Sequence, residues 1–376
     1  MNELDFPVHE YQNRIKRIQE KINEKGLDAL LLLDAEAIHY ASGFDCAWTS
    51  FVGEFSGVVI PADGEPRLIT RSLESKTVKQ GWMKKTRMYA DWEGPWKMLK
   101  EILEESGVTG GMIGVQENII TVRKLNGLKR IMPEAKIVNA DGLVENVMTQ
   151  PSELEIEFTR KAAKTAQAGL DKAMATIREG IPLFEVINKG TEAMYAAGMT
   201  EQQMLGNYTL SVVWGGPDGG APHETDVTRI IQKGDIVTPQ FRGAYKHYVG
   251  GATGSVYVGN QPPSSVTDAF KVAREMYLEA RKAMKPGATV GEVWQAANKI
   301  HHKAYGVNYN RILGARQGVA FLKGLGTYEE MLNPGVTFLV MPLLSDPLCI
   351  CVGASLMVTP EGCEEITRPR LELTTV

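Results

Sequence analysis

One histidine in this sequence is a candidate for acid/base chemistry. His223 follows the glycine-rich segment 215–220, whose residues would let the backbone come close to a ligand. Imidazole titrates near neutral pH, so His223 would be able to accept and return a proton during a reaction. A histidine that only caps a loop is the competing interpretation.

Several polar and aromatic residues are candidates for binding a substrate. Gln240, Arg242 and Arg316 would bind an oxyanion or orient a water molecule, and so steady a developing charge. Trp214 and Tyr248 would line the same site. For Tyr248, packing between neighbouring strands is an equally good interpretation.

The composition excludes several classes of protein. The chain has 376 residues, of which 43% are hydrophobic and 23% charged, as in a globular protein long enough for two cores. Its net charge of -4 argues against a nucleic-acid partner, because such binding usually needs a basic excess. Its 4 cysteines are too few for a disulfide framework. The acidic start predicts no secretory signal and no apolar run is long enough to span a membrane, so we expect a cytoplasmic protein.

The first 150 residues have the pattern of an α/β domain. Short apolar runs that suit strands alternate with amphipathic helices. The first helix is typical, since Tyr11, Ile15, Ile18 and Ile22 recur on one face. The pattern changes at Pro151, after which a Ser-Glu capping box begins a long helix. We therefore divide the chain into domains 1–150 and 151–376.

The second domain contains an internal repeat. A helix, a glycine turn and a second helix occur twice, with turns at Gly180 and Gly287. Glu185 and Glu292 are separated by the same offset, and strand-like runs lie between and after the helix pairs. The pattern predicts a duplicated α+β half-domain, whose antiparallel strands are covered by two helix pairs.

Four motifs of the second domain resemble, in order, those of the pita-bread enzymes, which include creatinase, prolidase, Xaa-Pro aminopeptidase and methionine aminopeptidase. They are the central hairpin, two turns and the C-terminal strand, at 232–248, 285–293, 332–336 and 358–367. The resemblance implies a pita-bread α+β fold for 151–376, after a smaller creatinase/prolidase-like α/β domain. It also implies a homodimer in which the N-terminal domain, with Trp48 and Glu54, reaches the site of the partner.

The residues at the metal positions of that family depart from its pattern. Metal-dependent members hold two divalent cations with two Asp, one His and two Glu, and the cations activate a bridging water. When the local motifs are aligned with those of the family, the five ligand positions fall on Gln240, Gly251, Ala315, Met341 and Gly353. Glycine, alanine and methionine offer no hard oxygen ligand. We therefore expect no metal and no other cofactor.

Creatinase shares the fold, works without metal, and has its catalytic histidine in a context that resembles the one around His223. Its two catalytic glutamates fall here at Thr253 and Met341, and its two carboxylate-binding arginines fall at Glu54 and Gly326. Loss of both arginines removes the clamp for a substrate carboxylate. Creatine is therefore a poor candidate for the substrate.

Glu54 reverses the charge of the arginine that it replaces. We therefore expect a ligand with a cationic or amidine-like group there. Trp48 and Phe51 are close in the sequence, and an aromatic wall beside a carboxylate suits a cation. A surface carboxylate is an equally good interpretation of Glu54.

These observations lead to one main hypothesis and two alternatives. The main hypothesis is a metal-independent, creatinase-like amidinohydrolase that cuts a non-peptide C–N bond in a small nitrogen-rich compound. The compound would be an amidine, urea, lactam or cyclic amidine, and His223 would be the acid/base group. Ectoine hydrolase, which opens a cyclic amidine, is an analogy within the family. The alternatives are a non-catalytic pita-bread binding module and an Xaa-Pro-type peptidase.

Overall fold

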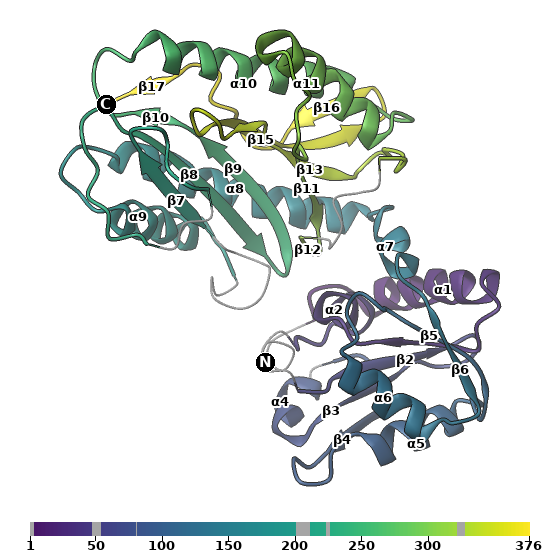
Figure 1. The fold of residues 1–376 in the computed structure, drawn as a ribbon. Coiled ribbons are helices and arrows are strands. Elements are labelled where there is room, and N and C mark those ends of the chain that lie inside the picture. Colours follow the sequence, from purple (N-terminus) through teal and green to yellow (C-terminus); the bar gives the residue numbers. More distant parts are fainter. Residues whose placement is uncertain (1–3, 47–53, 80, 201–210, 223–225, 322–327) are drawn as a thin grey trace. The chain divides into compact units, whose positions relative to one another are not determined.

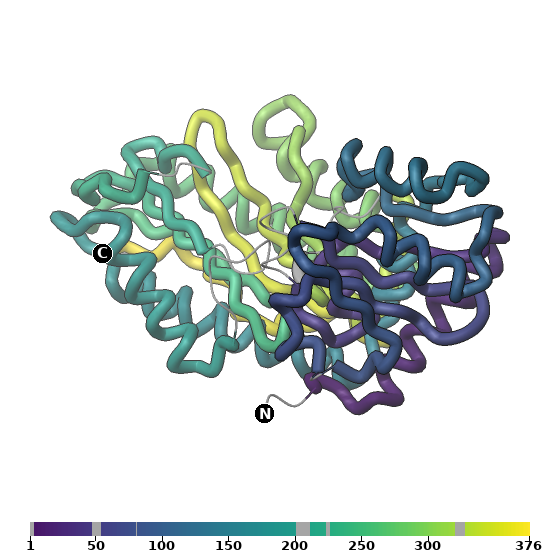
Figure 2. The backbone as a smooth tube through the Cα atoms, turned by 90° about the horizontal axis from the view of Figure 1, so that it is seen from below, coloured from purple at the N-terminus to yellow at the C-terminus, as the bar shows by residue number. Residues whose placement is uncertain are grey.

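The computed structural model describes residues 4–46, 54–79, 81–200, 211–222, 226–321 and 328–376. The chain divides into two compact units, Met1–Thr149 (unit 1) and Gln150–Val376 (unit 2). Purple and blue mark unit 1 in Figures 1 and 2, and teal, green and yellow mark unit 2. The structure thus has a mixed α/β N-terminal part and a larger α+β C-terminal part.

Unit 1 is built around a six-stranded sheet with the order β4-β3-β2-β1-β5-β6. Strand β1, Ala29–Leu32, is buried along its whole length, as its apolar run predicts. It pairs antiparallel with β2 and parallel with β5. The other strands are β2 (Gly57–Pro61), β3 (Arg67–Arg71), β4 (Thr86–Tyr89), β5 (Gly111–Val115) and β6 (Ala135–Asn139).

Helices lie against this sheet (Figure 1), and their buried apolar residues share a core with the strands. The first helix, α1 (Val8–Glu24), buries Tyr11, Ile15, Ile18 and Ile22, so the periodicity prediction is confirmed. The other helical segments among the described residues of unit 1 are α2 (Ala35–Ser42), the 3₁₀ turn η1 (Ser72–Glu74), α4 (Ser75–Val78), α5 (Trp96–Glu105), α6 (Val122–Ile131) and α7 (Leu143–Met148).

Unit 2 contains an 11-stranded sheet whose main path is β12-β11-β13-β15-β9-β8-β10-β17. Strands β14 and β16 pair with β15, and β7 pairs with β8. Near the C-terminus, β17 returns beside β10 (Figure 1). The strands are β7 (Val212–Gly216), β8 (Ile236–Tyr245), β9 (Tyr248–Gly254), β10 (Val256–Tyr257), β11 (Gly314–Gly318), β12 (Ala320–Phe321), β13 (Thr337–Val340), β14 (Leu343–Leu344), β15 (Ile350–Thr359), β16 (Gly362–Glu365) and β17 (Thr374–Thr375).

The predicted helix pairs are present in unit 2. The first is α8 (Glu153–Thr176) with α9 (Leu183–Ala196), and the second is α10 (Ser264–Ala283) with α11 (Val290–Tyr305). The turns contain Gly180 at φ 89° and Gly287 at φ 79°, backbone angles that favour glycine. A capping box begins α8 at Ser152, as predicted.

The sheet of unit 2 has a helix face and an opposite face. A β-carbon at Gly243 would lie 2.4 Å from the Ala166 nitrogen, and one at Gly250 would lie 2.3 Å from the Ala163 Cα, so both positions face α8. Side chains alternate along a strand. Gln240 and Arg242 of β8, with Gly251 and Thr253 of β9, therefore lie on the opposite face.

Candidate functional site

Three of the predicted substrate-binding residues lie together on the opposite face. In the pairing of β7 with β8, Trp214 is the partner of Thr238, two residues before Gln240. The Trp214 indole is buried and its Nε1 donates a hydrogen bond to the Cys349 Sγ at 3.2 Å. The Gln240 Nε2 lies 3.3 Å from the Met341 Sδ. Regular alternation of β7 and β8 is what brings Trp214, Gln240 and Arg242 to one side of the sheet.

Arg242 is the charged member of this group. Its side chain is half-buried, and desolvation by burial lowers the pKa of its guanidinium below the ordinary value. Its cross-strand partner is Gly251, and the ends of the Leu339 and Gln317 side chains lie beside that glycine. A partly desolvated guanidinium on this face is suited to binding a carboxylate or a developing oxyanion.

Tyr248 and Arg316 lie on the helix face instead. The Tyr248 hydroxyl is buried and donates a hydrogen bond to the Glu155 Oε1 at 2.8 Å. The Arg316 Nη1 makes an ion pair with the Glu330 Oε1 at 2.6 Å, and its cross-strand partner is Phe338, which belongs to the core with α10 and α11. The structure therefore does not bring these two side chains together with Gln240 and Arg242.

Of the remaining candidate residues, only Glu54 lies among the residues that the structure describes. His223, Trp48, Phe51 and Gly326 lie outside the described residues. Glu54 is exposed, and its backbone oxygen accepts a hydrogen bond from the Lys124 Nζ at 3.2 Å.

The charge of Glu54 also acts on two cations of its own unit. The hydrogen bond with Asp91 is the main cause that raises the pKa of Arg71, and the charge of Glu54 raises it further. Burial lowers the pKa of Lys124, and Glu54 opposes that shift. The cations Arg71 and Lys124 of the protein itself thus lie near the Glu54 carboxylate. A cationic ligand at this residue stays a prediction.

The residues at the five family metal positions do not fit a pair of divalent cations. Only Gln240 among them carries a side-chain oxygen. A β-carbon at Gly353 would lie 2.6 Å from the Met341 Cβ, and one at Gly251 would lie 2.8 Å from the Leu339 Cδ2. Methionine and leucine side chains therefore fill the space where two of the carboxylates would begin. Hard cations need oxygen ligands, which this arrangement does not supply.

Neutral polar groups take the place of charged ones around these positions. The Thr238 and Ser255 hydroxyls lie 2.6 Å apart, and the Ser255 Oγ accepts a hydrogen bond from the Cys351 nitrogen. The Thr253 Oγ1 donates to the Pro239 carbonyl at 3.0 Å. Burial raises the pKa of the Cys351 thiol to about 12, so this cysteine is a neutral packing group rather than a nucleophile.

Gln317 is a buried polar residue on the opposite face that the motif comparison missed. It is 4% exposed, and neither its Nε2 nor its Oε1 has a hydrogen-bond partner among the described residues. Its Nε2 would lie 3.0 Å from a β-carbon at Gly251. Strand alternation was the available signal, because Gln317 is two residues after Ala315, one of the five metal positions.

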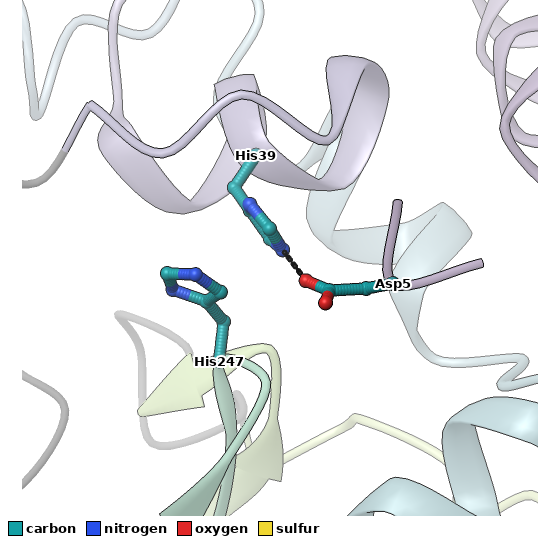
Figure 3. Close-up of side chains that lie close together, drawn as sticks. All are labelled: Asp5, His39 and His247. Atoms are coloured by element: carbon teal, nitrogen blue, oxygen red, sulfur yellow. Dashed lines mark ion pairs between the residues drawn. The ribbon is translucent and has the colours of Figure 1, made fainter. Parts of the chain in front are cut away.

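A second group of ionisable residues lies in unit 1. The Asp5 Oδ2 and the His39 Nε2 are 3.7 Å apart, and His39 is 3% exposed (Figure 3). Figure 3 also draws His247 of unit 2. His247 occupies the two-residue turn between β8 and β9 at φ 67°, beside Lys246 at φ 48°. Both residues thus have the left-handed backbone that a tight hairpin turn requires.

Comparison with known proteins gives relatives that match nearly the whole chain. A putative dipeptidase of Bacillus subtilis, YkvY, is 24% identical over 363 residues, covering 95% of this chain and 98% of the relative. Ectoine hydrolase of Halomonas elongata is 24% identical over 396 residues, covering 96% of each. The crystal structure of dipeptidase PepE from Mycobacterium ulcerans has a TM-score of 0.85 at 20% identity, covering 99% of each chain.

Two family models account for the two units. The creatinase/prolidase N-terminal domain matches residues 14–147, and metallopeptidase family M24 matches residues 157–361. No helix within the described ranges has the length and apolar character needed to cross a membrane. Since the second model spans more than half of the sequence, the chain belongs to metallopeptidase family M24, preceded by a creatinase/prolidase N-terminal domain.

Proposed function

We propose that this protein hydrolyses a C–N bond in a small nitrogen-rich compound without a pair of metal ions. One observation carries the proposal. The five positions that hold metal in the family present one carboxamide and one thioether, and the β-carbons of two missing carboxylates would overlap Met341 and Leu339. Membership of a hydrolase family supports an enzyme, while the donor set opposes metal-activated water.

In the proposed mechanism His223 supplies the acid/base function. Its imidazole takes a proton from the attacking water and returns a proton to the leaving nitrogen, so the C–N bond is exchanged for a C–O bond. The Gln240 carboxamide donates a hydrogen bond to the developing oxyanion, and the Arg242 guanidinium binds an anionic group of the substrate and so orients it. Trp214 forms a rigid apolar wall on the same face.

An Xaa-Pro-type peptidase is the second candidate. The names of several relatives favour it, since YkvY and PepE are both called dipeptidases, whereas ectoine hydrolase is named for a non-peptide substrate. We give the donor set more weight, because about 20–24% identity preserves a fold more readily than a substrate. A dipeptide is nevertheless a required member of any substrate screen.

The test is a screen for cleavage products with the wild type and the His223→Ala variant. Representative amidine, urea, lactam and cyclic amidine compounds are incubated with protein, alongside the dipeptide Ala-Pro, and released amine or ammonia is measured. We expect cleavage of a non-peptide compound, and a rate about 10²–10⁴-fold lower for His223→Ala. Cleavage of Ala-Pro alone would favour the peptidase, and equal rates for both proteins would remove His223 from the mechanism.

We also propose that the protein is a homodimer, as the family resemblance implies. In such a dimer Glu54 and its neighbouring aromatic residues would serve the site of the partner. Light scattering coupled to size-exclusion chromatography measures the mass directly. A mass of 41.3 kDa, that of one chain, at micromolar concentration would contradict the proposal.

A further inference from the structure

The buried carboxamide of Gln317 is the polar group of the opposite face whose hydrogen bonds are not accounted for. Burial of an amide without hydrogen-bond partners is unfavourable, so such groups are rare in folded proteins unless a ligand or water completes them. Neither atom of this carboxamide has a partner among the described residues. The Gln317 Oε1 can therefore accept a hydrogen bond from a ligand, and its Nε2 can donate two.

Its neighbours limit what that ligand is. The Gln317 Nε2 lies over Gly251, and Gly251 is also the cross-strand partner of Arg242, so the carboxamide and the guanidinium flank the same glycine. Paired residues of antiparallel strands have Cα atoms about 4.5–5.5 Å apart. Among the described residues, the side chains around this point carry hydroxyl, thioether, thiol and amide groups, and none of the five metal positions carries a carboxylate.

We propose that Gln317 is a specificity-determining residue that binds an uncharged amide or ureido group of a small carboxylic acid, while Arg242 binds its carboxylate. A carboxamide pairs with another planar amide through one donated and one accepted hydrogen bond, which a charged amidine does not match because it has no acceptor. The inference rests on the proposed function, since it names the substrate class of the same site. It differs from the cationic ligand expected at Glu54.

A second buried glutamine provides the matched control. Gln167 of α8 is 9% exposed, and both of its amide atoms are used within the protein. Its Nε2 donates to the Asp171 Oδ1 at 2.8 Å, and its Oε1 accepts from the Arg368 nitrogen at 2.7 Å. A change of Gln167 to methionine removes hydrogen bonds that fold the chain, whereas the same change at Gln317 removes bonds kept for the ligand.

The experiment measures binding and stability for the wild type, Gln317→Met and Gln167→Met. Binding is measured by isothermal titration with N-carbamoylglycine, which has a ureido group and a carboxylate, and with 4-methylpentanoate, which has the same shape but no ureido group. We expect the wild type to prefer N-carbamoylglycine, and Gln317→Met to lose about tenfold or more of that affinity. The Tm of Gln317→Met is expected to stay the same or to rise by about 2–4 °C, while Gln167→Met is less stable and binds normally.

Three results would overturn the inference. They are equal wild-type affinity for the two probes or no binding of either, unchanged affinity in Gln317→Met, and failure of Gln317→Met to fold, since the last would mean that the amide is needed by the protein itself. Product release from bound N-carbamoylglycine separates the two proposals. Ureido binding that depends on Gln317, without any cleavage, would retain the inference and count against the proposed function.

Discussion

The two faces of the unit 2 sheet use the same strands for different purposes. On the helix face, glycines let α8 approach the backbone of β8 and β9, and the buried Tyr248 hydroxyl is paired with Glu155. On the opposite face, Arg242 is half-buried and the Gln317 carboxamide has no partner among the described residues. The helix face is built for packing, whereas the opposite face holds one buried carboxamide, that of Gln317, which a ligand would complete.

The difference teaches where to look for function in a member whose metal ligands have been replaced. The replacement residues did not leave an empty site, because Met341 and Leu339 now fill the space of two carboxylates. The other side chains of this face include neutral polar groups and the Arg242 guanidinium. The chemistry of the site is therefore expected to involve hydrogen bonds and proton transfer.

The largest expected effect on the unfolding free energy comes from replacing two neighbouring glycines with alanine. Gly250→Ala adds a methyl group on the helix face, and Gly251→Ala adds one on the opposite face. In Gly250→Ala the new β-carbon meets the α8 backbone, with atoms of Ala163 at 2.3 and 2.4 Å, which cannot move without the helix. In Gly251→Ala it meets the ends of the Leu339 and Gln317 side chains at 2.8 and 3.0 Å, which can shift. We expect losses in unfolding free energy of about 3 kcal/mol and about 1 kcal/mol respectively.

Urea denaturation of both variants beside the wild type makes this measurement. Because the two glycines are adjacent in β9, backbone propensity is nearly the same for both, and the difference reports the two faces. Equal losses, or a larger loss in Gly251→Ala, would contradict the assignment of the faces.

A smaller effect is expected from Tyr248→Phe. The variant loses a buried hydrogen bond to the Glu155 carboxylate, which should lower the unfolding free energy by about 2 kcal/mol. Tyr309→Phe is the matched control, since its hydroxyl bonds only to the backbone of Leu343, and it should lose about 1 kcal/mol. Probe binding measured by titration should be unchanged in Tyr248→Phe, and a tenfold loss would return Tyr248 to the binding site.

Much of the fold follows from local patterns in the sequence. The apolar spacing of α1, the capping box at Ser152 and the glycine turns at Gly180 and Gly287 all have the structure that their residue types favour. These features depend on interactions within a few residues, which a sequence pattern contains. The expectation of a creatinase/prolidase-type domain followed by a pita-bread domain is likewise confirmed by the two family models.

The site was harder to predict for two reasons. The face of the sheet on which a residue lies depends on its position along the strand, and the residues that meet on that face come from strands far apart in the sequence. Arg316 follows Ala315, one of the five metal positions, in the sequence, yet adjacent residues of a strand point to opposite sides, so Arg316 lies away from Gln240. Gln317 has the correct parity, but its place over Gly251 depends on how β11 lies beside β9, which no local motif encodes. His223 stays a prediction, as does a cytoplasmic location.

The central claim is that hydrolysis here needs no metal pair, and its most direct test is activity after removal of metal. Protein is dialysed against EDTA, its metal content is measured by elemental analysis, and amine release from the best compound of the screen is compared before and after. We predict an unchanged rate with less than about 0.1 divalent ion per chain, since only Gln240 among the five positions offers a side-chain oxygen. A rate that is lost on dialysis and restored by added Mn²⁺ or Zn²⁺ would contradict the claim.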